Sequence, residues 1–185
     1  LTLHPSRQCR IHRNLNRHLL LLSKQRGHFF MPSGGQLCMS PDKNVSTAGL
    51  TEENIAIGDV FRLGSAVLEV SQGRQPCWRL NERFGRKMMA RHVQSTGRTG
   101  WYYRVLQPGT VEIGDGLMRI ERLTPDWTIA RIWRCFYIDT LNRDELAGIA
   151  GLARLAAGWR AYAANRLASS RIEDWTRRLD GQETI

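Results

Sequence analysis

Hydrophobic and polar residues alternate over short stretches in the middle of the chain, and each stretch ends at turn residues. Residues 66–71 alternate as expected of a half-buried β-strand. Residues 101–106 are aromatic and β-branched, which also favours a strand. One internal helix is predicted from Asn81 to about residue 94. Shorter strands are predicted at 54–57, 60–63, 110–113 and 117–123, the last two as a hairpin. Many short strands with one internal helix indicate a β-barrel-like domain.

From residue 124 onward the hydrophobic spacing becomes helical. Pro125 follows Thr124 at a position typical of a helix start, and apolar residues recur at helical spacing over 127–137. Asn142 precedes Glu145 by three residues, which resembles a capping box. Further helices are predicted at 152–167 and 172–179. The predicted fold class is therefore mostly β with α: a β-barrel-like domain over 41–124, followed by a small all-α domain of three helices over 125–185.

Residues 1–40 differ from the rest of the chain. They hold six Lys or Arg and no acidic residue, and the chain begins at Leu1. Ile11, Leu15, Leu19 and Leu22 fall at helical spacing, so a basic amphipathic helix is one interpretation. The favoured interpretation is a disordered tail, or a stretch that is read out of frame or from a misassigned start. We therefore expect an atypical basic segment that is foreign to the fold.

Composition narrows the class of protein. The chain has 185 residues and a net charge of +10, with 42% hydrophobic residues, which is ordinary for a globular chain. No apolar run approaches the roughly 20 residues of a membrane-spanning helix, and no signal-peptide pattern is present. Four cysteines are too few for a disulfide scaffold, so a cytoplasmic location is expected.

Basic residues are concentrated in two places. The excess at the N-terminus does not by itself indicate a protein that binds nucleic acid. Between Arg74 and Arg104 there are eight basic residues, with Glu82 as the only acid. Arginine presents a fork that matches phosphate oxygens, so this island is a candidate anion site. The alternative is a solvated helix face.

Cys77 is the thiol with the most suggestive neighbours. It follows Pro76 in a loop after a predicted strand, with Arg74 and Arg79 close by in sequence. Positive charge favours the thiolate, which is the nucleophilic and metal-binding form of cysteine. The alternative is an inert loop thiol. A Ser-His-Asp arrangement is not supported, because only His92 lies in the part expected to fold, and no phosphate-binding glycine motif is present.

Several motifs in order resemble a known family. Residues 44–50, 58–59, 71–80 and 96–109 are similar to the MOSC domain, in its bacterial YiiM-like branch. Residues 139–141 and 172–179 resemble the three-helix domain that follows MOSC in that branch. The resemblance covers about residues 44–181. Upstream of it, Pro41-Asp42-Lys43 stands where the family usually reads Phe-Gly-Glu.

The resemblance implies a function and a site. MOSC proteins of this branch have a β-barrel-like fold and reduce N-hydroxylated compounds, such as 6-hydroxylaminopurine, with a molybdenum cofactor (molybdopterin). The cofactor's pterin carries a phosphate and a dithiolene, and a protein thiolate completes the metal's ligands. Carried over, Cys77 is the metal ligand and catalytic residue. The implied cofactor-binding residues are Asn44, Thr47, Arg74, Arg79, Gly97, Gly100, Tyr103 and Arg104.

Each implied residue has an expected role. Arg74, Arg79 and Arg104 are expected to hold the pterin phosphate or to polarise the substrate oxygen. Gly97 and Gly100 would let the backbone approach the cofactor, and Tyr103 would line the pocket. The implied partners are an electron-donor reductase and a small N-hydroxylated substrate, with no membrane and no nucleic acid polymer. The alternative function is a non-catalytic cofactor-binding module or a persulfide sulfur carrier built on Cys77.

Overall fold

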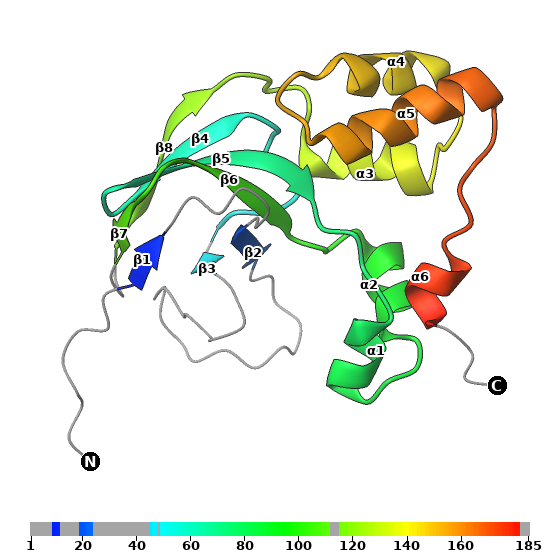
Figure 1. Ribbon diagram of the computed structural model, residues 1–185, viewed down its shortest axis with the longest axis horizontal. Helices are drawn as coiled ribbons and strands as arrows, with labels where there is room; N and C mark the ends of the chain where they lie inside the picture. The colour runs from blue at the N-terminus through cyan, green and yellow to red at the C-terminus, as the bar shows by residue number, and fades with distance from the viewer. Residues whose placement is uncertain (1–8, 12–18, 24–44, 48, 112–114, 182–185) are drawn as a thin grey trace.

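A curved sheet and a layer of helices make up the computed structural model, which describes residues 9–11, 19–23, 45–47, 49–111 and 115–181 (Figure 1). The described strands form a six-stranded sheet of order β3-β2-β6-β5-β4-β8 and a separate ladder of β1 with β7. All pairings are antiparallel except that of β2 with β3. The strands are β1 (Cys9–Ile11), β2 (Leu19–Ser23), β3 (Val45–Thr47), β4 (Asp59–Leu63), β5 (Ala66–Gly73), β6 (Trp101–Gln107), β7 (Gly109–Val111) and β8 (Leu117–Arg122).

The strand β5 is more buried than its alternation predicts. Leu68 and Val70 lie in the core, but Glu69 and Ser71 on the opposite face are buried as well. Helices cover that second face: a Cβ added at Gly73 would lie 3.0 Å from the Trp159 ring. Because β5 is covered on both faces, its polar residues are buried like its apolar ones, unlike those of a half-buried strand.

Three of the predicted elements pair or fold differently. Residues 54–57 contribute a single bridge, Ala56 to Thr128, instead of a strand. The predicted hairpin of 110–113 with 117–123 is wrong, because β7 pairs with β1 and β8 pairs with β4. The predicted helix over 81–94 is two helices, α1 (Arg79–Phe84) and α2 (Met89–Thr96). Gly85 separates them with a left-handed φ of 59°, which ends α1.

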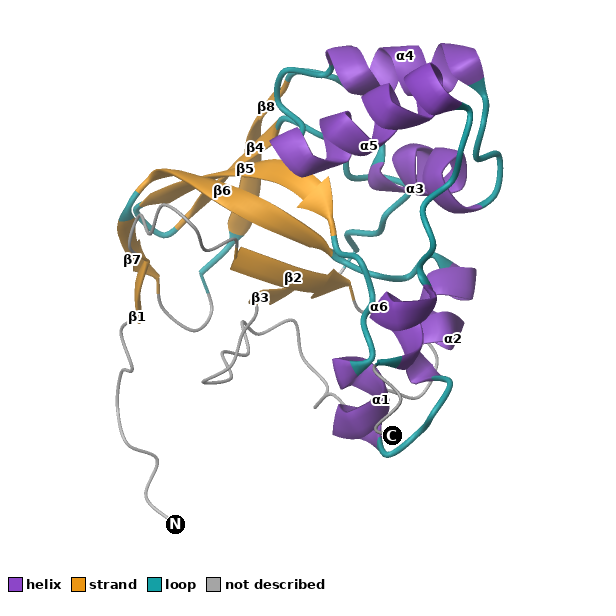
Figure 2. Cartoon of the chain, turned by 45° about the vertical axis from the view of Figure 1, so that its right-hand side comes forward, coloured by secondary structure: helices purple, strands orange, loops and turns teal. Residues whose placement is uncertain are grey.

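Four helices follow the sheet: α3 (Ile129–Tyr137), α4 (Arg143–Gly151), α5 (Ala157–Ser169) and α6 (Thr176–Asp180). The predicted cap of α4 is confirmed, since Asn142 accepts a hydrogen bond from the Glu145 backbone N–H at 3.2 Å. In Figures 1 and 2, α3, α4 and α5 lie over one side of the sheet, whereas α6 lies beside α1 and α2. The fold class is confirmed as a mostly β domain followed by a helical unit. None of the helices in the described part of the chain is long and apolar enough to span a bilayer.

Two short pieces of the N-terminal segment form strands, one in the separate ladder with β7 and one in the six-stranded sheet. Cys9–Ile11 pairs with β7, and Leu19–Ser23 pairs with β6. For these residues the helical interpretation is wrong, because the free edge of β6 offers backbone groups that an extended segment can satisfy. These pairings also differ from the expectation of a segment foreign to the fold. The remaining residues of 1–40 lie outside the described residues.

One core joins the sheet and the helices. It runs from Leu68 and Tyr103 in the sheet to Ile132 and Trp159 in the helices. Backbone hydrogen bonds cross the same boundary, such as Ala156 N–H to the Ser71 carbonyl at 3.0 Å. A second, smaller cluster lies between α1, α2 and α6 and consists of Leu80, Met89, Ala90 and Leu179.

Candidate functional site

The loop that carries Cys77 connects β5 to α1 at the end of the sheet. Its first residue, Arg74, donates its backbone N–H to the Gly100 carbonyl at 3.0 Å, which ties the loop to the start of β6. The Cys77 carbonyl accepts from the Leu80 N–H at 2.9 Å, so the cysteine lies directly before the first turn of α1, which starts at Arg79. Cys77 is half-buried and free. The thiol therefore lies where the sheet meets the small helices.

Arg178 of α6 holds this loop from the other end of the chain. Its guanidinium donates to the Pro76 carbonyl at 3.1 Å and to the Gln75 carbonyl at 3.3 Å. Its own carbonyl accepts from the Trp78 N–H at 2.8 Å. These contacts lie on both sides of Cys77 in sequence, so α6 fixes the path of the loop.

A hollow of about 490 Å³ opens beside Cys77. Two loop neighbours, Trp78 and Arg79, share its lining with residues from the C-terminal segment. The Arg79 guanidinium carbon lies 5.7 Å from the centre of the Trp78 ring. Three arginines and one carboxylate line the hollow, so it suits an anionic ligand. Its lining residues are Cys77, Trp78, Arg79, Asp174, Trp175, Arg177 and Arg178.

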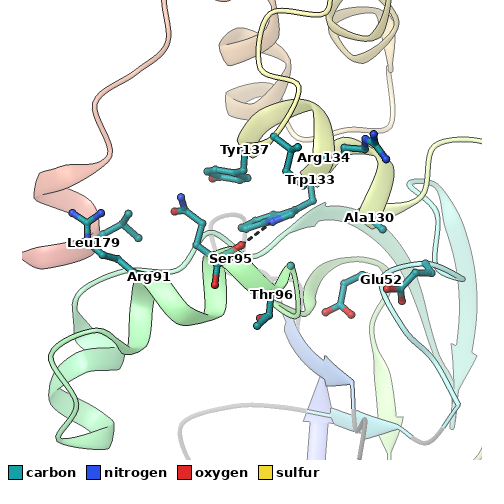
Figure 3. Close-up of a pocket in the computed structure, with 13 residues that line it drawn as sticks. Glu52, Arg91, Ser95, Thr96, Ala130, Trp133, Arg134, Tyr137 and Leu179 are labelled. Carbon is teal, nitrogen blue, oxygen red and sulfur yellow. Dashed lines mark hydrogen bonds between the residues drawn. The ribbon is translucent and has the colours of Figure 1, made fainter. Parts of the chain in front are cut away.

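A second hollow, of about 420 Å³, lies between α2 and α3. Trp133 and Tyr137 reach from α3 toward Ser95 and Thr96 of α2 (Figure 3), and their ring centroids are 4.1 Å apart. The Trp133 indole N–H donates to the Gln94 carbonyl at 3.2 Å.

Tyr137 connects this hollow to the cysteine loop. Its hydroxyl accepts a hydrogen bond from the Gln75 side chain at 3.1 Å. Burial raises the pKa of Tyr137 to about 12, so the phenol stays protonated at neutral pH. This hydrogen bond thus joins a residue that lines the second hollow to the loop that carries Cys77.

The two implied glycines lie next to the second hollow. Gly97 ends α2 with a φ of 68° and lines the hollow. The Gly100 N–H donates to a carboxylate oxygen of buried Glu52 at 2.7 Å, so Glu52 anchors the turn before β6. Both positions have the left-handed backbone that favours glycine.

Tyr103 and Arg104 are not at either hollow. Tyr103 is fully buried in the core, edge-on to Phe61 at 5.9 Å, and burial raises the pKa of its phenol well above the usual range. The expectation that it lines the pocket is corrected, because residue 103 belongs to the inward face of β6. Arg104 forms an ion pair with buried Glu69 at 2.7 Å, on the face covered by helices. Glu69 also pairs with Arg154 at 3.0 Å.

The remaining implied residues are only partly described. Thr47 belongs to β3, where its backbone pairs with Ser23. Asn44 lies outside the described residues. The structure therefore brings together Cys77 and Arg79, and ties Arg74 to Gly100. The sequence did not identify Arg178, although it lies within the 172–179 motif, and it did not identify Glu52 or Tyr137.

The two described thiols differ in their surroundings. Cys135 is buried inside α3, and burial raises its pKa to about 11. The Cys135 thiol therefore stays protonated at neutral pH. Cys77 is half-buried and shares its hollow with three arginines. In the described ranges no three His, Cys, Asp or Glu residues gather as a metal site.

Comparisons with known proteins identify the class to which this fold and site belong. A model of the MOSC domain matches residues 41–118, and a model of the YiiM-like 3-alpha helix domain matches residues 127–170. The molecule is thus a MOSC domain that carries a helical unit. More specifically, the chain belongs to the YiiM-like family, because it is 35% identical to protein YiiM of Escherichia coli (strain K12) over 153 residues, covering 82% of this chain and 68% of YiiM.

The structural comparison agrees. The crystal structure of YiiM from Escherichia coli superimposes with a TM-score of 0.71 at 36% identity, covering 75% of this chain and 68% of that one. The uncharacterized protein YflK of Bacillus subtilis (strain 168) is 45% identical over 119 residues, covering 64% of this chain and 54% of YflK. A protein of Gibberella moniliformis named "Reductase" is 40% identical over 106 residues, covering 57% of this chain and 19% of that protein. The chain thus spans about half the length of YflK.

Proposed function

We propose that this protein binds a molybdenum cofactor through Cys77 and reduces N-hydroxylated compounds, of which 6-hydroxylaminopurine is an example. The observation that carries the proposal is the half-buried Cys77 in a hollow with three arginines, within a MOSC domain. The relative named "Reductase" supports the reaction type. We also propose that the protein works in the cytoplasm, in keeping with its few cysteines.

The residues at the Cys77 hollow fit such a cofactor chemically. A thiolate is a soft ligand that suits a soft metal centre. Arg79, Arg177 and Arg178 supply the positive charge that a pterin phosphate needs. Arg74 stays a candidate for the same role, since its backbone is fixed against Gly100. We leave Tyr103 and Arg104 out of the proposed ligand set, because one is buried in the core and the other neutralises Glu69.

The reaction itself balances with two electrons. An N-hydroxylated amine takes up two electrons and two protons, its N–O bond breaks, and an amine and water leave. The cofactor supplies the two-electron centre when it is bound, and a protein reductase supplies the electrons. The chain's own residues bind and orient: Cys77 ligates, the arginines hold the phosphate, and Arg178 keeps the Cys77 loop in place.

Anaerobic reduction of 6-hydroxylaminopurine by cofactor-loaded protein tests this function. Reduced methyl viologen serves as the electron donor, so no protein partner is needed. We expect turnover by the wild type, none above background by Cys77→Ser, and wild-type turnover by Cys38→Ser, which also removes one thiol. Near-wild-type turnover by Cys77→Ser contradicts the ligand assignment. Protein that lacks molybdenum but carries labile sulfane sulfur on Cys77 supports the sulfur-carrier alternative.

A further inference from the structure

The basic island of the sequence divides into paired and unpaired cations. Arg91 is paired with Asp180, and Arg104 with Glu69. Within the described residues, the side chains of Arg83, Arg86 and Lys87 form no hydrogen bond or ion pair, and all three are exposed. Most basic residues of the island are therefore not available to bind one small anion together. Arg83 of α1 and Arg86 and Lys87 of the following turn are exposed to solvent.

These exposed cations lie on the helix and turn that follow the Cys77 loop. Helix α1 begins two residues after Cys77, and Arg79, its first residue, lines the same hollow as Cys77. Figure 2 shows α1, α2 and α6 stacked at one end of the molecule, apart from the layer formed by α3, α4 and α5. The Cys77 hollow thus shares Arg79 with the helix that carries the first of these cations.

The surface also contains large apolar side chains. Phe84 is 41% exposed and lies between Arg83 and Arg86 in sequence, and Met88 is 61% exposed and directly follows Lys87. Aromatic residues and methionine are enriched at the centres of protein interfaces, and surrounding charges steer a partner of opposite sign. Glu82 interrupts the cations, which suits a protein rim better than a continuous phosphate backbone.

We propose that this α1 surface, formed by Arg79, Arg83, Phe84, Arg86, Lys87 and Met88, is the docking site of an acidic electron-carrier protein. This proposal rests on the proposed function, because a protein that reduces its substrate at Cys77 must receive electrons from another molecule. Opposite charges bring the carrier to the surface, and Phe84 and Met88 form the apolar centre of the contact. Electrons then enter the site from the α1 end of the molecule.

Charge reversal on α1 tests the docking site, with purified flavodoxin as the acidic probe. The test variant is Arg83→Glu with Lys87→Glu, neither of which lines the Cys77 hollow. The matched control is Arg62→Glu with Arg171→Glu, which makes the same change in net charge at exposed positions on β4 and after α5. Two quantities are measured: flavodoxin binding by titration calorimetry at low and high salt, and turnover with reduced methyl viologen.

The proposal predicts a specific combination of results. Wild type and control bind flavodoxin with affinity that falls as salt rises, and the Arg83/Lys87 variant binds at least about tenfold more weakly. Viologen-driven turnover is the same in all three proteins.

Equal flavodoxin binding by the test variant and the control overturns the docking site. Tighter binding to a DNA duplex than to flavodoxin at the same salt, lost in the Arg83/Lys87 variant, also overturns it and assigns the surface to nucleic acid. Absence of viologen-driven turnover in the wild type would refute the proposed function. It would not bear on the docking surface, which the flavodoxin binding measurements test separately.

Discussion

Gly97 shows how a single residue combines a backbone requirement with a packing requirement. Its φ of 68° lies in the left-handed region, and a Cβ added there would lie 3.3 Å from Cδ1 of Trp133. The resemblance to the MOSC domain implies that glycine at residue 97 lets the backbone approach a cofactor. The structure adds a second reason for glycine, because Trp133 of the second hollow packs directly over it.

We therefore expect Gly97→Ala to destabilise the protein by about 1–2 kcal/mol. The cause is the left-handed backbone together with the tight contact to Trp133. Urea denaturation followed by tryptophan fluorescence measures it. Gly158→Ala is the control: Gly158 lies in α5 with no atom within 4 Å of an added Cβ, so alanine should be neutral or stabilising there. Equal midpoints for Gly97→Ala and the wild type would contradict the account.

At the scale of elements, α6 acts on a loop about a hundred residues away in sequence. Arg178 donates to the Gln75 and Pro76 carbonyls, while Asn81 donates from its side chain to the Leu179 carbonyl at 2.9 Å. The short helix α6 is thus a clamp on the Cys77 loop.

Removal of the clamp should loosen the loop. We expect Arg178→Ala to raise the rate of Cys77 alkylation by iodoacetamide several-fold, because two carbonyl contacts beside the thiol are lost. Mass spectrometry of labelled peptides follows Cys77, and buried Cys135 reports on global unfolding in the same sample. Arg177→Ala is the control from the same helix and the same hollow. An unchanged Cys77 rate in Arg178→Ala, or a parallel rise at Cys135, would argue against a local clamp.

A second pair of elements, α3 and α4, is joined by the ion pair of Arg131 with Glu145, at 2.7 and 2.9 Å. The hydrogen bonds from Arg131 hold the pKa of Glu145 below its usual value. A carboxylate with a lowered pKa adds stability above its unfolded-state pKa, and this stability is lost as the pH falls through the folded-state pKa.

The pair should therefore give a small, pH-dependent contribution. At pH 7 we expect Glu145→Gln to cost about 0.5 kcal/mol, because both side chains are partly exposed. The difference from the wild type should shrink as the pH falls below about 4, where the wild-type carboxylate is protonated. Urea melts at several pH values measure this. A gap that stays constant down to the lowest pH would show that the effect of Glu145 is not electrostatic.

At the scale of the whole molecule, local patterns predicted more than long-range contacts. Alternation located β5, aromatic and β-branched residues located β6, and capping chemistry located α4, because each signal lies within a few residues. The break between α1 and α2 at Gly85 was missed. The side chain of Asn81, the predicted helix start, makes long-range contacts instead: it accepts from the Ala90 N–H and donates to the Leu179 carbonyl. The true partner of β8 and the contacts of Arg178 were also missed, because they join segments far apart in sequence.

The same long-range contacts make the sheet and the helical unit one cooperative structure. The predicted domain boundary falls at residue 124, yet one core spans both sides of that boundary. We expect truncation after residue 124 to abolish cooperative unfolding, since Gly73 would lose its contact with Trp159 and Ile55 its contact with Ile129. Calorimetry of the truncated chain tests this. A sharp transition near the wild-type temperature would show instead that the domain of residues 41–124 folds alone.

The central claim, that Cys77 ligates a molybdenum cofactor, is tested most directly by the molybdenum content of purified protein. Wild type and Cys77→Ser are produced in parallel in cells that make the cofactor, and molybdenum per folded chain is measured by mass spectrometry. We predict about one molybdenum per wild-type chain, since a soft thiolate suits this metal. Loss of even an outer-shell partner of a ligand typically lowers metal affinity about 10–100-fold, so loss of the thiolate itself should leave Cys77→Ser with about a tenth of the molybdenum or less. Equal molybdenum in both folded proteins, or none in the wild type, would contradict the account.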